Sequence, residues 1–116
     1  MPRYPFRVLL VSMPFGALER QALGLSLLKP CLERRGLACD IRYLNFPFAE
    51  FTGLEDYCWL NYEAPYTAFA GDWIFTEALY GARPKADLAY KQDVLRGTWR
   101  MKESDIERLE DRKSVV

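Results

Sequence analysis

The hydrophobic pattern at the start of the chain predicts a strand, a helix and a second strand. Residues 7–13 hold four consecutive apolar side chains, Val8 to Val11. An unbroken apolar run of this length is typical of a central parallel strand that is covered on both faces. Residues 39–44 alternate between apolar and polar side chains instead, as in a half-exposed or edge strand.

Between these strands, leucines recur at helical spacing and predict a helix that begins between Leu18 and Ala22 and ends at Arg35. Gly36 suits the left-handed residue that follows many helices. Pro30 lies inside the predicted helix, where its ring costs about 3 kcal/mol. We expect either a kink near Ser26 or a helix that packing holds together despite the proline.

The pattern changes after residue 45, where strand-like alternation ends and aromatic residues become dense. Between Tyr43 and Tyr80 lie 12 of the chain's 17 aromatic residues. The segment 71–81, bounded by glycines, predicts a short and mostly buried helix with Trp73 and Phe75 as packing anchors. A second helix is predicted over 82–96, with Pro84 in its first turn.

The last segment, residues 101–116, predicts a short helix that begins at Ser104. Ser104-Asp-Ile-Glu107 has the sequence of a capping box. Ile106 and Leu109 are the apolar side chains of its first turns, so we expect this helix to be frayed and mostly exposed.

These elements predict an α/β fold with a Rossmann-like (flavodoxin-like) start in a single domain, 1–116. A βαβ unit (1–45) is followed by an aromatic-rich helical part (46–100) and an exposed C-terminal helix or tail (101–116). Two strands do not make a stable parallel sheet, which normally needs three or more. The sheet is therefore incomplete within this chain, and we expect the chain to self-associate as a homodimer.

The composition narrows the classes of function. The 16 basic and 16 acidic residues balance, which argues against a nucleic-acid partner. The chain has no histidine, which removes histidine-dependent catalysis and histidine ligands to metals. No catalytic and no metal-binding constellation is expected, so we predict that the chain alone is not catalytic.

The three cysteines, Cys31, Cys39 and Cys58, form no Cys-x-x-Cys pair and are interpreted as structural. Their sparse, odd number suits a reducing compartment. The apolar run that starts at Val8 is far too short for a signal peptide or a membrane span. We therefore expect a cytoplasmic protein without a membrane partner.

The loop from Ser12 to Arg20 is the candidate binding site. In open α/β sheets, ligands bind beyond the carboxyl ends of the strands, where a helix N-terminus offers free N–H groups. Glycine allows the backbone to approach a ligand closely. The predicted cofactor-binding residues are Ser12, Met13, Pro14, Phe15, Gly16 and Gly24. The alternative is an ordinary strand–helix turn, in which Phe15 packs inward or against a neighbouring chain.

The stretch from Val8 to Gly36 resembles the start of the cobalamin-binding domain that precedes the catalytic barrel in many radical S-adenosylmethionine enzymes. The similar features are an apolar strand, a Pro-containing loop, Leu23-Gly-Leu25 opening a helix and Arg-Arg-Gly36 closing it. Ser12-Met-Pro-Phe-Gly-Ala-Leu-Glu-Arg20, Arg42-Tyr-Leu-Asn45 and the segment 70–81 resemble those enzymes that mature ribosomally synthesised peptides as peptide C-methyltransferases.

This resemblance implies cobalamin as the cofactor, a precursor peptide as a partner, and a longer parent protein of which this chain is a fragment or truncated form. S-adenosylmethionine and an iron–sulfur cluster would bind only in that parent. The Asp-x-His-x-x-Gly motif of other cobalamin proteins is replaced here by Met13-Pro-Phe-Gly16. Two functions therefore stay open: the cobalamin-binding-like domain of a methyltransferase, and a degenerate module that self-associates or binds a partner protein or peptide.

Overall fold

The computed structural model describes residues 2–116, which form a mixed α/β chain of two compact units. The N-terminal unit ends at Tyr57 and the C-terminal unit begins at Cys58. The sequence predicted a division after residue 45; the first compact unit extends twelve residues further, because the helices after the second strand pack against the loop after the first.

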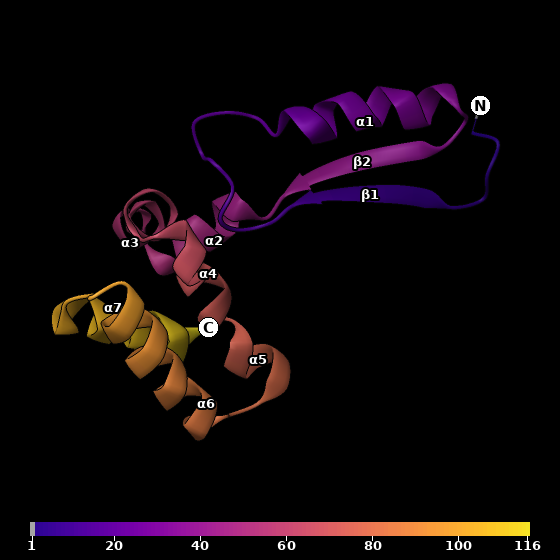
Figure 1. Ribbon diagram of the computed structural model, residues 1–116. Coiled ribbons are helices and arrows are strands. Elements are labelled where there is room, and N and C mark those ends of the chain that lie inside the picture. The colour runs from indigo at the N-terminus through magenta and orange to yellow at the C-terminus, as the bar shows by residue number, and fades with distance from the viewer. Residues whose placement is uncertain (1) are drawn as a thin grey trace. The chain divides into compact units, whose positions relative to one another are not determined.

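The N-terminal unit contains two strands and three helices (Figure 1). Their order is β1 (Arg7–Ser12), α1 (Leu23–Arg34), β2 (Ala38–Tyr43), α2 (Asn45–Thr52) and α3 (Leu54–Cys58). The predicted strand–helix–strand order is confirmed, and both predicted strands are found within one or two residues of their expected ends.

The two strands pair in parallel, with Arg7 opposite Ala38 and Ser12 opposite Tyr43. Helix α1 runs along one face of this two-stranded sheet (Figure 1). The other face is not covered by a helix of this unit, and the Leu9 side chain on it is 57% exposed. The expectation that the first strand is covered on both faces is therefore wrong, because a sheet of two strands with one helix has only one covered face.

Helix α1 begins at Leu23, later than expected, and continues through Pro30. Among the helix residues none is buried, and Leu23, Leu27 and Leu28 are exposed by 71%, 59% and 49%. The predicted helix end is confirmed: Gly36 has a φ of +82°, and its N–H donates to the carbonyl of Glu33.

The C-terminal unit is entirely helical in the part of the chain described. It contains η1 (Trp59–Glu63), η2 (Tyr66–Ala68), α4 (Ala70–Trp73), α5 (Thr76–Tyr80), α6 (Pro84–Ala89), η3 (Tyr90–Thr98) and α7 (Glu103–Val115). Helices η1 and η3 are wide, π-helical segments and η2 is a 3₁₀ turn. The absence of strands after residue 45, which the sequence predicted, is confirmed for residues 46–116.

The single helix predicted over 71–81 is instead two short ones. The chain turns at Ile74 and Phe75, and the Thr76 hydroxyl donates a 2.7 Å hydrogen bond to the Trp73 carbonyl where α4 ends. Trp73 is buried, but Leu79 and Tyr80 are exposed by 71% and 64%. The expectation of a mostly buried helix therefore holds for its first half and fails for its second.

The core of this unit lies between α4, η3 and α7. Ile74, Leu95, Ile106 and Leu109 are each at most 1% exposed. The prediction that the last helix is mostly exposed is therefore wrong, since Ile106 and Leu109 lie one turn apart and share a buried face. The predicted capping box is also not formed: the helix begins at Glu103 after an extended Lys102, which places Ser104 inside the first turn.

Candidate functional site

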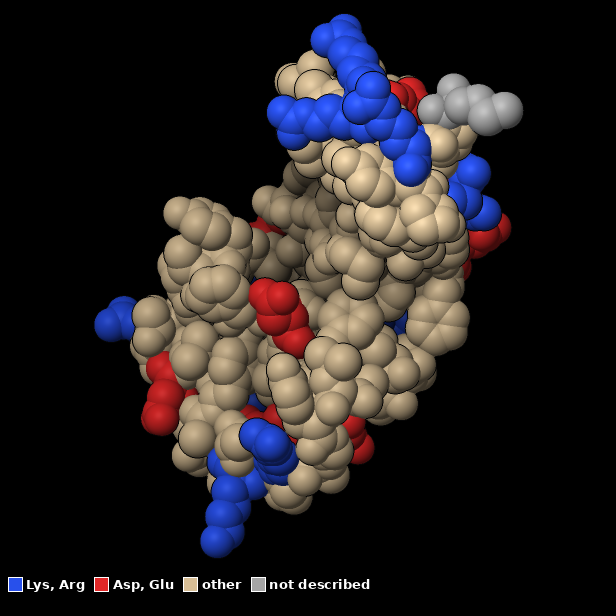
Figure 2. Space-filling view, turned by 90° about the vertical axis from the view of Figure 1, so that its right-hand side faces the viewer, with Lys and Arg blue, Asp and Glu red and all other residues tan. Residues whose placement is uncertain are grey.

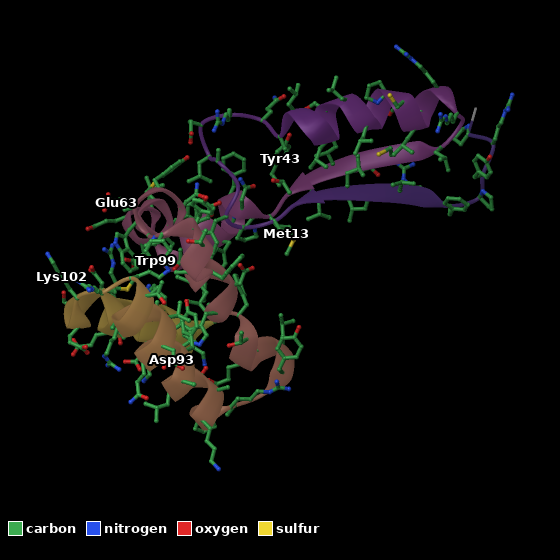
Figure 3. All side chains as sticks on the ribbon, viewed as in Figure 1. Met13, Tyr43, Glu63, Asp93, Trp99 and Lys102 are labelled. Atoms are coloured by element: carbon green, nitrogen blue, oxygen red, sulfur yellow. The ribbon has the colours of Figure 1, made fainter. Side chains whose placement is uncertain are left out.

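The loop that follows β1 divides into a part exposed to solvent and a part packed inside the N-terminal unit. Ser12 ends the strand, and Met13 is 61% exposed. Met13 projects to the side of the sheet away from α1, opposite to Tyr43 at the end of β2 (Figure 3). Of the five predicted cofactor-binding residues in the loop, Ser12 to Gly16, Met13 is thus the exposed one.

Phe15 points into the unit instead of toward a ligand. Its ring lies 5.6 Å from that of Phe48 in an edge contact and 5.1 Å from that of Tyr57. Tyr57 is fully buried, and Phe48 comes from α2. Phe48 and Tyr57 therefore form the packing surface for Phe15, which agrees with the inward orientation that the turn alternative predicted.

Gly16 is held by side chains of the same aromatic segment. Its carbonyl accepts hydrogen bonds from the Tyr57 hydroxyl and, at 3.4 Å, from Nδ2 of Asn45. A β-carbon on Gly16 would lie 3.2 Å from Ser12 Oγ and 3.4 Å from Asn45 Nδ2, closer than most real contacts. The lack of a side chain at Gly16 thus serves the packing of the loop within the unit.

Gly24 lies apart from the other predicted residues, in the first turn of α1. A β-carbon there would meet no atom within 4 Å. The structure therefore gathers Ser12, Met13, Pro14, Phe15 and Gly16 in one loop, and Gly24 is exposed on the helix that follows it.

A pocket of about 330 Å³ borders the second half of this loop, at the carboxyl end of β2. Its lining residues are Leu18, Glu19, Arg20, Gln21, Tyr43 and Phe46. This is the end of the strands at which open α/β sheets bind ligands. Sequence reasoning included the loop side of this pocket but missed Tyr43 and Phe46, although the position of Tyr43 as the last residue of a strand is a signal that could have found it.

The size of this pocket and the direction of Phe15 bear on the cobalamin that the resemblance implies. The pocket is at the small end of ligand-binding cavities, and a corrin ring with its nucleotide tail is much larger. Phe15 is turned away toward Phe48 and Tyr57, and it is not available as an apolar floor for a corrin. Within residues 2–116, no group of three or more Cys, Asp or Glu side chains is placed to hold a metal ion.

The three cysteines differ in their exposure to solvent. Cys39 is buried, Cys58 is half-buried and Cys31 is exposed, and all three are free thiols. The structural role predicted for the cysteines fits the burial of Cys39 best. No helix among residues 2–116 combines the length and the apolar character that crossing a bilayer requires.

Strand β2 carries two opposite charges two residues apart. Asp40 and Arg42 flank Ile41, and Arg7 of β1 binds the Asp40 carboxylate at 2.8 Å. This hydrogen bond and the charge of Arg7 hold the pKa of Asp40 below its ordinary value. Lys29 of α1 donates a hydrogen bond to the main-chain carbonyl of Cys39 and also pairs with Glu33 at 3.1 Å.

The visible face of the protein is mostly uncharged (Figure 2). Among residues 2–116, twenty large hydrophobic residues are exposed, including Phe6, Leu9 and Met13 around β1 and three leucines on α1. In comparisons with known proteins, no protein-family model, no curated protein and no solved structure matches the chain.

Proposed function

We propose that this chain is a non-catalytic binding module with a Rossmann-like start, and that it self-associates through the outer edge of β2. The observation that carries the proposal is the alternation Asp40-Ile41-Arg42 on a strand that has β1 on one side and, among residues 2–116, no strand on the other. Such an edge presents unpaired N–H and C=O groups to another strand.

The charges on β2 are self-complementary in one antiparallel register. If Ile41 lies opposite Ile41 of a second copy, Asp40 lies opposite Arg42 of that copy and Arg42 opposite its Asp40. Each such pair contributes about 0.2–1 kcal/mol. A shift by two residues would instead place Asp40 opposite Asp40, or Arg42 opposite Arg42, and like charges in these positions are destabilising. The pattern therefore selects a symmetric partner and one register.

A second copy would also complete the sheet. Two βαβ units joined at β2 form four strands, which passes the three-strand minimum for a stable sheet. Antiparallel pairing of two identical edge strands creates a two-fold axis normal to the sheet. Rotation about this axis does not exchange the two faces of the sheet, so both α1 helices lie on the same face. The exposed leucines of α1 would then lie on one continuous helical layer.

Lys29 sets the strength of this association. A lysine at a sheet edge is a common protection against unwanted pairing, and the Cys39 carbonyl must release the Lys29 ammonium before it accepts a hydrogen bond from another strand. Glu33 offers the released ammonium an alternative partner. We therefore expect a weak, reversible dimer that Lys29→Met makes tighter.

The test uses two charge-reversal variants, Asp40→Lys and Arg42→Glu, studied by analytical ultracentrifugation. Each variant alone opposes like charges and should associate about tenfold more weakly than the unaltered chain. An equimolar mixture should restore the dimer, because a copy with Asp40→Lys and a copy with Arg42→Glu face each other with opposite charges at both positions. Both positions are exposed, so circular dichroism should show an unchanged fold.

The matched control is Arg7→Gln, which removes the ion pair with Asp40 but leaves the charges of β2 unaltered. It should leave the association constant nearly unchanged. A mixture of the two reversed variants that stays monomeric, or an unaltered chain that is monomeric up to millimolar concentration, would contradict the proposal.

A second candidate function is the cobalamin-binding-like domain of a radical S-adenosylmethionine peptide methyltransferase. The position of the pocket at the carboxyl end of β2 supports it. Titration with hydroxocobalamin, followed by its visible spectrum, distinguishes the two. Because the pocket is small and Phe15 packs inward, we expect no spectral change with this chain. Tight stoichiometric binding that Phe15→Ala alters would favour the cofactor domain.

A further inference from the structure

The C-terminal unit contains a pocket that the proposed function does not use. Its volume is about 310 Å³, within the range of small-molecule sites. Aromatic side chains of three different helices contribute to its lining, together with a few polar groups. The lining includes Trp73, Thr76, Tyr80, Arg83, Asp87 and Tyr90.

The aromatic wall of this pocket is held in place by hydrogen bonds. The Trp73 and Tyr90 rings stack with centroids 5.0 Å apart. The Trp73 indole Nε1–H donates to Asp87 at 2.9 Å, and the Tyr90 hydroxyl donates to the Ala68 carbonyl at 2.6 Å. Burial raises the pKa of Tyr90 to about 12, with a smaller contribution from the charge of Asp72, so this hydroxyl stays neutral. The wall is thus pre-formed.

The negative charges near the pocket are already bound. Lys113, whose side chain is 8% exposed, donates to Glu77 at 2.9 Å and to Asp87 at 3.2 Å. Both oxygens of Asp87 have a donor, since Trp73 binds the other one. The carboxylates therefore have little remaining capacity for a cationic ligand.

Arg83 differs from these groups because its guanidinium has no carboxylate partner in the part of the chain described. It lies over the Tyr80 ring, 5.4 Å from the centroid. A cation–π contact of this kind does not use the N–H donors of the guanidinium, which can bind a carboxylate through two hydrogen bonds. The pocket thus combines an apolar aromatic wall with Arg83, whose hydrogen-bond donors are available. Lys113 also lines the pocket, but its ammonium is bound to Glu77 and Asp87.

We propose that this pocket binds a small aromatic carboxylate, with its ring against the Trp73, Tyr80 and Tyr90 wall and its carboxylate on Arg83. A neutral aromatic amide of the same shape fills the same space but lacks the charge that Arg83 recognises. The site lies wholly in the C-terminal unit, so it is independent of strand pairing at β2.

Phenylacetate and phenylacetamide are the matched probes, and NMR of the indole N–H groups is the readout. Binding should shift the Trp73 signal, which reports on its hydrogen bond to Asp87, and leave the signal of Trp99 in place. Trp59→Phe and Trp99→Phe assign the three tryptophan signals. Phenylacetate should bind about tenfold more tightly than the amide, the effect expected of one charge-assisted pair.

Arg83→Gln should lower the affinity for phenylacetate to that for phenylacetamide, with the Trp73 signal of the free protein unchanged. Arg100→Gln removes an exposed arginine of the same unit outside the pocket and should leave both affinities as they are. Equal affinity for the acid and the amide, loss of affinity in both variants, or no shift at Trp73 up to millimolar concentration would overturn the proposal.

Discussion

The two units of this protein bury their apolar residues to very different degrees. In the C-terminal unit, Ile74, Leu95, Ile106 and Leu109 are almost completely buried. In the N-terminal unit, the largest fully buried side chains are Tyr57 and Asn45, which bind the loop after β1 through their polar groups. Leu9 of β1 and Leu23, Leu27 and Leu28 of α1 remain exposed.

The difference follows from the geometry of the elements. A helix with one apolar stripe needs only one neighbouring element to bury that stripe. The C-terminal unit consists of helices that bury each other's apolar stripes. A strand places successive side chains on opposite faces, so a buried parallel sheet needs a layer on each side. In the N-terminal unit, α1 covers one face of the two-stranded sheet, and no other helix of this unit covers the opposite face.

The largest expected effect is a difference in stability loss when a leucine is replaced by alanine in each of the two units. Leu109→Ala should lower the free energy of unfolding of the C-terminal unit by about 2–5 kcal/mol, because it leaves a cavity in a closed core. Leu27→Ala, on an α1 position that is 59% exposed, should change stability by less than about 0.5 kcal/mol. Urea unfolding followed by circular dichroism measures both.

This comparison would fail if both leucine variants lost similar stability in dilute, monomeric protein. If Leu27→Ala loses stability only at concentrations where the chain self-associates, the exposed face of α1 is covered in the dimer. A concentration series of unfolding curves distinguishes these results.

A smaller effect tests the polar packing of the N-terminal unit. Tyr57→Phe removes the hydrogen bond to the Gly16 carbonyl and keeps the ring contact with Phe15. We expect a loss of about 1 kcal/mol and faster hydrogen exchange in the loop of residues 13–17. The control is Tyr66→Phe, since the Tyr66 side chain is 89% exposed. An unchanged exchange rate in the loop would show that Tyr57 acts through its ring alone.

The smallest expected effect concerns the pH dependence of the Arg7–Asp40 pair. The folded-state pKa of Asp40 is lowered, chiefly by the hydrogen bond from Arg7, so the pair stabilises the fold above the ordinary carboxyl pKa of about 3.9. That contribution is lost as the pH falls through the folded-state pKa. Because both side chains are exposed, it should also weaken with salt.

An NMR titration of the Asp40 carboxyl carbon measures this pKa directly. Arg7→Gln should return the Asp40 pKa toward its ordinary value, whereas Lys85→Gln, in the C-terminal unit, should not change it. If the titration midpoint of Asp40 is the same with and without Arg7, the ion pair is not the cause of the lowered Asp40 pKa.

At the candidate site, the position of the loop could be predicted from the sequence, but the direction of its side chains could not. The loop from Ser12 to Gly16 was predicted from the strand that precedes it and the helix that follows, and the structure places it at the carboxyl end of β1. Whether Phe15 faces a ligand or the interior depended on Phe48 and Tyr57, which lie more than thirty residues away. Side-chain direction in a loop is decided by such long-range contacts.

Local patterns in the sequence were enough for β1, β2, the end of α1 at Gly36 and the helical character of residues 46–116, because strand alternation, glycine caps and helical periodicity act over a few residues. Tertiary structure alone decided the break at Ile74–Phe75, the burial of α7 and the ion pairs of Lys113 with Glu77 and Asp87. These features arise from contacts between helices that are distant in sequence. The local pattern of charges predicted an exposed, frayed last helix, but burying Ile106 and Leu109 stabilises that helix against the rest of the unit.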